Sequence, residues 1–331
     1  MPKDGNFSHE ASFDDLRGGT AGFQRPDSPL IIAVKLAKLE DIKKALRESP
    51  EAVNEPDMYL QTPIFWAVRH GNMGVMQILL KAKAQVRDVA NKFGYTPLMR
   101  AVHYGQLEVG EKLLNLRADL DALDKFNGSV LQVAATAGQI EAVQWLLSKR
   151  QDVMHQLVLN SDEDGRTPLH VAAKNGHSTV VYMLLEAHAV PNTRDRHGRP
   201  PLLFSLARND VLSAQSLIYH KAEIDFRDPH GRPLLHVLVE HLCANRQRSD
   251  TLCGLVTLLQ ADVNINEKDR NALTPMMIAV RGNHPMMCAL LAAFDADLRN
   301  LSGIARACAF FEIAAVLEEF TVLRQNQFSK S

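Results

Sequence analysis

Four side chains of the types that bind zinc lie within one stretch of the chain: His236, His241, Cys243 and Cys253. Imidazole and thiolate are the usual ligands of protein zinc, and structural sites supply them at short characteristic spacings. The two cysteines of this stretch are too far apart to form such a pair. We therefore predict neither a metal nor a cofactor at these residues, and a structural role for His236.

Other catalytic patterns are missing from the sequence. It contains no Gly-x-x-x-x-Gly-Lys phosphate loop, no Gly-x-Ser-x-Gly nucleophile turn and no His-Glu-x-x-His metal helix. The four cysteines, Cys243, Cys253, Cys288 and Cys308, show no short paired spacing and lie at apolar or helical positions. They are expected to be reduced and buried thiols. The sequence thus predicts no catalytic residues.

The elements that position these residues come from a phrase that returns about every 33 residues. Its Thr-Pro pair is clearest at Thr62, Thr96, Thr167 and Thr274. Weaker copies place further units, so that units start near residues 28, 62, 96, 129, 167, 200, 233, 274 and 302. Longer intervals locate insertions at residues 151–164 and 240–250, the second expected to form a loop or a lengthened helix.

Within one unit, each residue type favours a particular local structure. Thr167 is a good helix N-cap and Pro168 suits the first helical position, where its missing N–H costs nothing. Leu169, Ala172 and Ala173 share one helical face, and a second apolar stripe includes Leu184. The residue nine positions after the cap is expected to close the first helix in the left-handed conformation. In the units that start near residues 62, 96, 129, 167 and 200, this residue is Gly71, Gly105, Gly138, Gly176 and Asn209, respectively.

This pattern resembles the ankyrin repeat, in which a turn ending in Asp-x-x-Gly-x-Thr-Pro-Leu-His leads into two antiparallel helices. The Ala-Asp-Val-Asn-like link between units appears at residues 118–121, 222–225, 261–264 and 296–299. The resemblance implies an all-α solenoid of stacked helix-turn-helix units joined by short β-turn or hairpin links, with about eight repeats plus degenerate terminal caps. In this family His at the slot of His170 and His236 forms hydrogen bonds between turns.

The domain organisation follows from these units. Residues 1–27 read as a flexible N-terminal tail, residues 28–322 as the ankyrin repeat domain and residues 323–331 as a C-terminal tail. The N-terminal segment has no apolar run, so neither a signal peptide nor a membrane span is expected. A net charge of −1, from 37 basic and 38 acidic residues, gives no global field toward nucleic acid or membranes.

Partner binding in ankyrin arrays usually uses the concave face, lined by the turn tips and the first helices. In this register the N-terminal half of that groove is aromatic, and aromatic residues with Arg are the types that anchor protein interfaces. The candidate partner-binding residues are Tyr59, Trp66, His70, Phe93, Tyr95, Arg100, His103, Tyr104 and Phe126. The alternative is that Trp66 packs against a neighbouring helix and that Phe93 or Phe126 braces a turn.

Two groups of basic residues accompany this surface. The tips of the C-terminal half carry Arg166, Arg196, His197, Arg199, His230 and Arg232, and a solvated surface is the simpler interpretation because single exposed charges contribute little. A second row precedes the links, at Lys83, Arg117, Arg150, His188 and Lys221. Cations near the last carbonyls of each second helix suit the helix dipole, and the alternative is a stripe for an acidic partner or anionic lipid heads.

The sequence therefore predicts a non-catalytic scaffold or adaptor that binds another protein through the concave groove. It is expected to be cytoplasmic, with nuclear entry left open, and monomeric apart from its partner, without nucleic acid or membrane insertion. The alternatives are a recruitment subunit of an enzyme complex and a regulator that inhibits its partner by occlusion.

Overall fold

The computed structural model describes residues 27–87, 90–149, 156–244, 252–299 and 301–328. Almost all of the expected N-terminal tail, Arg150 of the basic row, residues 151–155 of the first insertion and residues 245–250 of the second lie outside these ranges. The chain divides into two units, one formed by Met1–Gln85 with Val89–Lys92 and the other by Val86–Asp88 with Phe93–Ser331. Each unit is described by itself.

The first unit consists of two helical pairs. Helix α1 (Pro29–Lys35) packs against α2 (Leu39–Glu48), and α3 (Pro63–Arg69) packs against α4 (Met73–Lys81). A short 3₁₀ helix, η2 (Pro50–Asn54), lies between the pairs in the chain and contacts both α2 and α3. Ile31, Ile42, Phe65 and Leu79 are fully buried and form its core.

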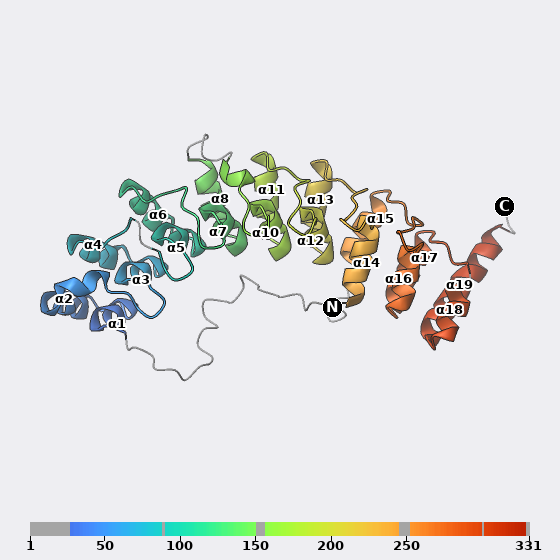
Figure 1. Cartoon of the computed structure of the whole chain (residues 1–331), viewed down its shortest axis with the longest axis horizontal. Coiled ribbons are helices and arrows are strands. Elements are labelled where there is room, and N and C mark those ends of the chain that lie inside the picture. Colours follow the sequence, from blue (N-terminus) through green and yellow to red (C-terminus); the bar gives the residue numbers. More distant parts are fainter. Residues whose placement is uncertain (1–26, 88–89, 150–155, 245–251, 300, 329–331) are drawn as a thin grey trace. The chain divides into compact units, whose positions relative to one another are not determined.

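The second unit continues with the same motif (Figure 1). Its helices follow one another in pairs, in the chain order α5 (Pro97–His103), α6 (Leu107–Asn115), α7 (Val130–Ala137), α8 (Ile140–Leu147), α10 (Pro168–Asn175), α11 (Ser178–Glu186), α12 (Pro201–Ala207), α13 (Val211–Tyr219), α14 (Leu234–Ala244), α15 (Cys253–Gln260), α16 (Pro275–Arg281), α17 (Pro285–Ala293), α18 (Leu301–Ala307) and α19 (Phe311–Phe328). First helices contact the next first helix from α5 through α18. The fold is the all-α repeat solenoid that the sequence predicts.

Local sequence explains where these helices begin and end. The hydroxyls of Thr96 and Thr274 accept the backbone N–H groups of Met99 and Met277, at 3.2 and 3.3 Å. Thr62 occupies the N-cap position of α3, but the expected capping hydrogen bond is not formed. Among the described residues, its buried hydroxyl has no hydrogen-bond partner. The left-handed closing residue is confirmed at each predicted position, with φ of 62° to 75° at Gly71, Gly105, Gly138 and Gly176 and 61° at Asn209.

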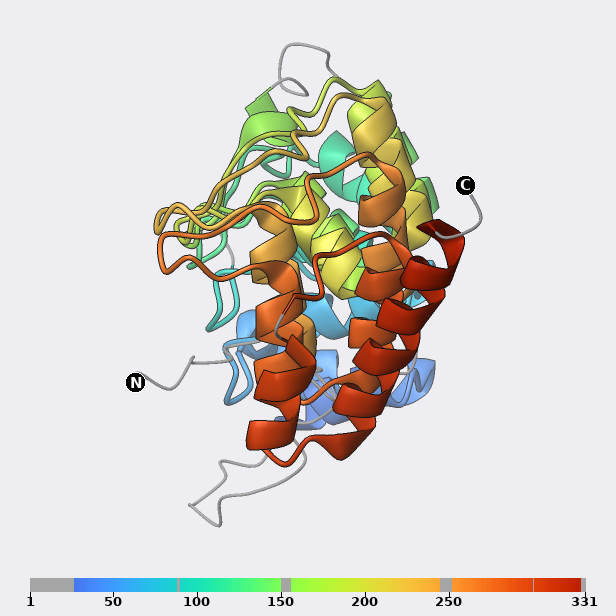
Figure 2. The ribbon, with the colours of Figure 1, turned by 90° about the vertical axis from the view of Figure 1, so that its right-hand side faces the viewer.

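The turns that join the helical pairs are short. Within the described residues they form no sheet, and only the isolated bridges Leu123–Ser129 and Arg227–Pro233 mark hairpin character. Figure 2 shows the turns of the second unit, green through orange, gathered along one side of its helices. The core runs between first and second helices, where Leu169, Val181 and Leu184 are fully buried.

The two insertions are accommodated differently. In the first, residues 156–159 are helical, and Leu157 and Val158 are buried. In the second, α14 lengthens to Ala244, as one of the expected alternatives proposed, and α15 then packs against α12. Gly254 permits this packing, because a Cβ on it would overlap the backbone carbonyl of Leu206.

The last described element is a long helix. Helix α19 continues to Phe328, beyond the predicted end of the repeat domain at residue 322. Ile313, Ala314 and Leu317 bury the start of α19 against α17 and α18. None of the described helices combines the length and the apolar character that crossing a membrane requires.

Candidate partner-binding surface

A carboxylate organises the tip of most of the repeated turns. In six turns an Asp five residues before the helix cap accepts two backbone N–H groups through Oδ1, from the residues two and four positions later, at 2.7 to 2.9 Å. These residues are Asp57, Asp124, Asp162, Asp195, Asp228 and Asp269. The first and second residues after each Asp form the outer end of the turn. This Asp is the first residue of the Asp-x-x-Gly-x-Thr-Pro motif in the sequence, although the motif alone assigned it no role.

Backbone hydrogen bonds join neighbouring turns. Lys125 N–H donates to the carbonyl of Phe93 at 3.0 Å, Glu163 N–H to Phe126 at 2.8 Å, and Arg196 N–H to Asp164 at 2.8 Å. The side chains at successive tips are therefore held in a fixed register. A pre-ordered surface of this kind loses little conformational entropy when a partner binds.

Three of the predicted binding residues lie in the first unit. The indole N–H of Trp66 donates to Asp57 Oδ2 at 3.1 Å, and Lys35 Nζ lies 4.0 Å from the Trp66 ring centroid. Tyr59 is half-buried, with Lys92 Nζ 4.6 Å from its ring centroid, and His70 is exposed. Trp66 thus contacts a residue of the neighbouring first helix α1, which is the packing that the alternative interpretation describes, whereas Tyr59 and His70 lie at the turn and at the helix end.

The remaining predicted residues lie in the second unit. Phe126, at a turn tip, is 36% exposed, and Phe93, Tyr95, His103 and Tyr104 are half-buried. His103 and Tyr104 form an edge-to-face pair with ring centroids 4.8 Å apart. Burial raises the pKa of Tyr95 to about 12, a shift to which the Asp124 carboxylate adds, so its phenol is neutral at physiological pH.

Arg100 requires a correction. Its side chain is 1% exposed, so it does not belong to the surface that a partner can reach. Helix α5 packs against the neighbouring first helix α7, and Val133 and Val171, at positions equivalent to Arg100, are also buried. The equivalent Phe204, Val237 and Ile278 are half-buried, so this position is most enclosed in the earlier repeats of the second unit. Its guanidinium carbon lies 5.1 Å from the Tyr104 ring centroid, so Arg100 contacts the face of that ring.

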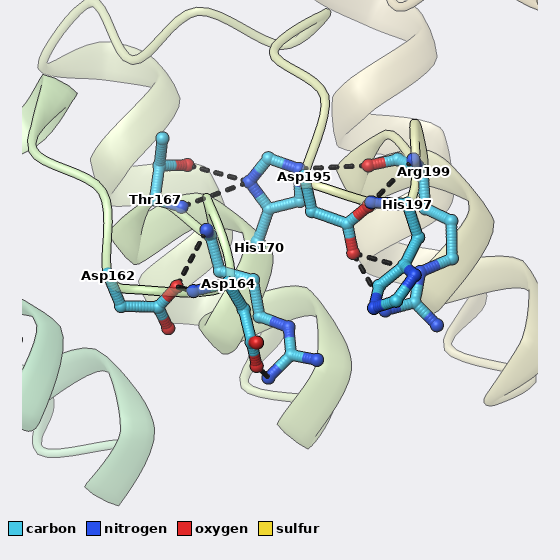
Figure 3. A network of polar contacts seen from close by, with 8 residues as sticks. Asp162, Asp164, Thr167, His170, Asp195, His197 and Arg199 are labelled. Carbon is cyan, nitrogen blue, oxygen red and sulfur yellow. Dashed lines mark hydrogen bonds and ion pairs between the residues drawn. The ribbon is translucent and has the colours of Figure 1, made fainter. Parts of the chain in front are cut away.

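A buried polar network holds the centre of the second unit (Figure 3). His170 Nδ1 accepts the backbone N–H of Thr167 at 3.1 Å, so Nε2 carries the proton and donates to the Arg199 carbonyl at 3.1 Å. Thr167 and His170 also form a capping box at the start of α10. Burial lowers the pKa of His170 to about 4, against the opposing effects of the Arg199 carbonyl and Asp195. His170 is therefore a neutral connector between repeats, as the resemblance implied.

Arginines of the C-terminal tips divide into paired and exposed groups. Arg166, Arg199 and Arg232 form ion pairs at 2.7 to 2.8 Å with acids of their own turns, Asp164, Asp195 and Asp228. Partial burial by itself would raise the pKa of Asp228. Hydrogen bonds from Arg232 outweigh this effect and hold the pKa below its usual value. Arg196, His197 and His230 are exposed.

The candidate zinc residues are not assembled into a site. His236 Nε2 lies 2.9 Å from the Leu273 carbonyl. Burial lowers the pKa of His241, and the nearby charge of Arg199 adds to this effect. Throughout the part of the chain that the structure describes, no three His, Cys, Asp or Glu side chains gather closely enough to hold a metal ion. The expectation of buried thiols holds for Cys288, whose pKa burial raises to about 12, and is wrong for Cys253 and Cys308, which are exposed.

The described residues of the basic row share one backbone conformation. Lys83, Arg117, His188 and Lys221 are exposed and left-handed, with φ of 63° to 68°. Asp262 and Asp295 adopt the same conformation at 64° and 66°, so later repeats carry acids at this place. An Asn side chain from the preceding repeat binds the carbonyl of this residue in three cases, for example Asn192 Nδ2 to Lys221 at 3.1 Å.

These features define a class of protein: a helical-repeat solenoid whose turn tips are ordered by hydrogen bonds and whose repeats are connected through buried polar contacts. The family model for ankyrin repeats in three copies matches residues 30–124 and 111–195, which together make up half of the chain. The protein belongs to the ankyrin-repeat family, whose arrays are protein–protein interaction domains.

Curated proteins with similar sequences are longer and diverse. Mouse inversin is 28% identical over 238 residues, 71% of this chain and 22% of inversin. Neurogenic locus notch homolog protein 1 of Xenopus tropicalis is 33% identical over 146 residues, 44% of this chain and 6% of that protein. The putative E3 ubiquitin-protein ligase XBAT31 of Arabidopsis thaliana is 27% identical over 172 residues, 49% of this chain and 38% of the ligase. The chain thus spans less than half of each of these relatives.

Proposed function

We propose that this protein is a non-catalytic scaffold or adaptor that binds a partner protein through the surface formed by its turn tips and first helices. The observation that carries the proposal is the fixed tip geometry, in which Asp carboxylates and turn-to-turn hydrogen bonds hold exposed side chains such as Phe126 in register. The proposed binding residues in the second unit are Phe93, Tyr95, His103, Tyr104 and Phe126; Tyr59, Trp66 and His70 are their counterparts in the first. The protein is proposed to act in the cytoplasm as a monomer.

Affinity capture with the intact chain tests this function. Tyr104→Ala and Phe126→Ala should each weaken binding of the captured partner by about 2 kcal/mol, as truncation of aromatic interface anchors does. Lys112→Ala, an exposed change on α6, is the matched control and should leave binding unchanged. Circular dichroism and thermal melting verify that each variant folds. Equal binding by all three variants would contradict the proposal.

Trp66 is a poor choice for the same experiment. Its ring contacts Lys35 and its indole N–H donates to Asp57, so Trp66→Ala would disturb the first unit as well as any interface. Trp66→Phe removes the hydrogen bond and keeps most of the ring. If Trp66 acts only by bracing, this variant should lower the thermal midpoint and leave partner affinity intact.

A second candidate function is recruitment of a substrate to an enzyme complex. It is favoured by the similarity to two proteins named as E3 ubiquitin-protein ligases, of which the matching region makes up 38% and 41%. Mass spectrometry of the captured partner separates the candidates, because recruitment requires an enzyme in the complex. Adding an excess of this protein to that enzyme then tests the occlusion alternative, which predicts a fall in the activity of the enzyme.

A further inference from the structure

Cationic and hydrogen-bond-donating side chains remain exposed at three consecutive turns of the second unit. Arg196 and His197 follow Asp195, His230 lies two residues after Asp228, and Arg270 follows Asp269. Among the described residues, these four side chains form no ion pair and no hydrogen bond. They differ from Arg199 and Arg232, which are neutralised by Asp195 and Asp228 at 2.8 Å.

The three turns form a continuous row, which we call the basic tip row (Arg196, His197, His230 and Arg270). A Cβ on Gly198 would lie 2.7 Å from the Pro229 ring, and a Cβ on Gly231 would overlap the Arg270 side chain. Each turn is therefore in contact with the next one. The gathered loops in Figure 2 include these turns.

Acidic groups near the row are already engaged or lie at its end. Asp195 and Asp228 bind their own turns, Glu240 pairs with Arg232, and Asp269 accepts two backbone N–H groups. Glu163 is an exposed acid in the turn preceding Arg196. The row is thus locally basic in a chain whose net charge is −1.

We infer that the basic tip row docks an extended acidic segment of the partner protein. This inference rests on the proposed function and names the chemistry of the partner. Guanidinium groups pair with carboxylates in a bidentate fork. Neighbouring first helices pack about 8–10 Å apart. A segment in the extended polyproline II conformation rises about 3.1 Å per residue with three residues per turn, so carboxylates at every third residue share one face and meet successive turns.

A protein segment fits this row better than nucleic acid does. Binding to a nucleic-acid backbone draws on many phosphate contacts, whereas this row offers two guanidinium groups and ends at the Glu163 carboxylate. Ankyrin repeats, moreover, are protein-interaction modules.

A labelled synthetic peptide tests the inference with the full chain. The probe is a repeating Glu-Gly-Ser decapeptide with glutamate at every third position, and its counterpart has glutamine in place of glutamate. Fluorescence anisotropy should show binding of the glutamate peptide that weakens as salt rises, and no binding of the glutamine peptide. The double variant Arg196→Gln, Arg270→Gln should weaken binding about five-fold, since exposed ion pairs contribute modestly.

The matched control is Lys112→Gln, Arg117→Gln, which removes the same charge from α6 and the turn after it. It should bind the peptide as the unchanged protein does. Equal loss in both double variants, or equal binding of the glutamine peptide, would overturn the inference. So would tighter binding of a short RNA duplex that is lost in the Arg196→Gln, Arg270→Gln variant. None of these results bears on the Tyr104 and Phe126 experiment, which uses the captured partner.

Discussion

The segments at residues 162–170 and 228–236 occupy the same place in two repeats and keep different parts of one network. Both turns are closed by an Asp carboxylate, and both helices carry a buried His whose Nε2 contacts the carbonyl of the next repeat, at 3.1 Å for His170 and 2.9 Å for His236. The cap differs, because Thr167 offers a hydroxyl and an N–H, whereas Pro233 offers neither.

The consequence appears at the second nitrogen of each imidazole. His170 Nδ1 accepts the Thr167 N–H, but His236 Nδ1, in a side chain only 1% exposed, has no hydrogen-bond partner among the described residues. A buried polar atom without a partner costs stability. The repeat at residues 228–236 therefore keeps the hydrogen bond between turns and lacks the bond that caps the helix.

The largest expected effect separates the two histidines. His170→Ala should lower the free energy of unfolding by about 3–5 kcal/mol, because it leaves a cavity and removes the partner of the Thr167 N–H and the Arg199 carbonyl. His236→Ala should lower the free energy of unfolding by about 1–3 kcal/mol less than His170→Ala does, since it removes only the contact with the Leu273 carbonyl. Urea denaturation measures both. Equal losses would show that the Thr167 contacts contribute nothing.

Acid should weaken the first network. The pKa of His170 falls to about 4 in the folded chain from an ordinary value of 6.5, so between these values the unfolded state binds more protons. Stability from this group is complete above pH 6.5, declines as the pH falls and is lost by about pH 4, by about 3 kcal/mol in total. Denaturation across this range should show a steeper decline in the unchanged protein than in His170→Gln. Parallel curves would contradict a buried neutral imidazole.

Exchanging the cap residues should make the contributions of the two regions to stability more alike. Thr167→Pro removes the hydroxyl and N–H that face His170 and should cost about 1–3 kcal/mol. Pro233→Thr supplies them to His236 and should stabilise by about 0.5–1 kcal/mol, the gain being reduced by the greater freedom of the unfolded chain. Thermal or urea midpoints compare the pair. A destabilised Pro233→Thr variant would mean that the backbone there cannot adopt the capping geometry.

Local rules explain what could be predicted. Thr-Pro pairs set the starts of α3, α5, α10 and α16, and residues nine positions later adopt the left-handed conformation at the predicted places, because capping and backbone sterics act within one turn of chain. Apolar periodicity likewise identified Leu184 as core. The family itself was evident because the same local phrase recurs along the chain.

Contacts between repeats decided the rest. The burial of Arg100, the exposure of Cys253 and Cys308, and the close approach of Gly254 to Leu206 depend on which surface meets the next helix. The same holds for the charge of the turn tips, since Arg199 and Arg232 are neutralised in three dimensions whereas Arg196 and Arg270 stay exposed. By itself the sequence determined the repeat and the places where its helices begin, because these depend on neighbours along the chain. Which side chains remain available for a partner was decided only by packing between repeats.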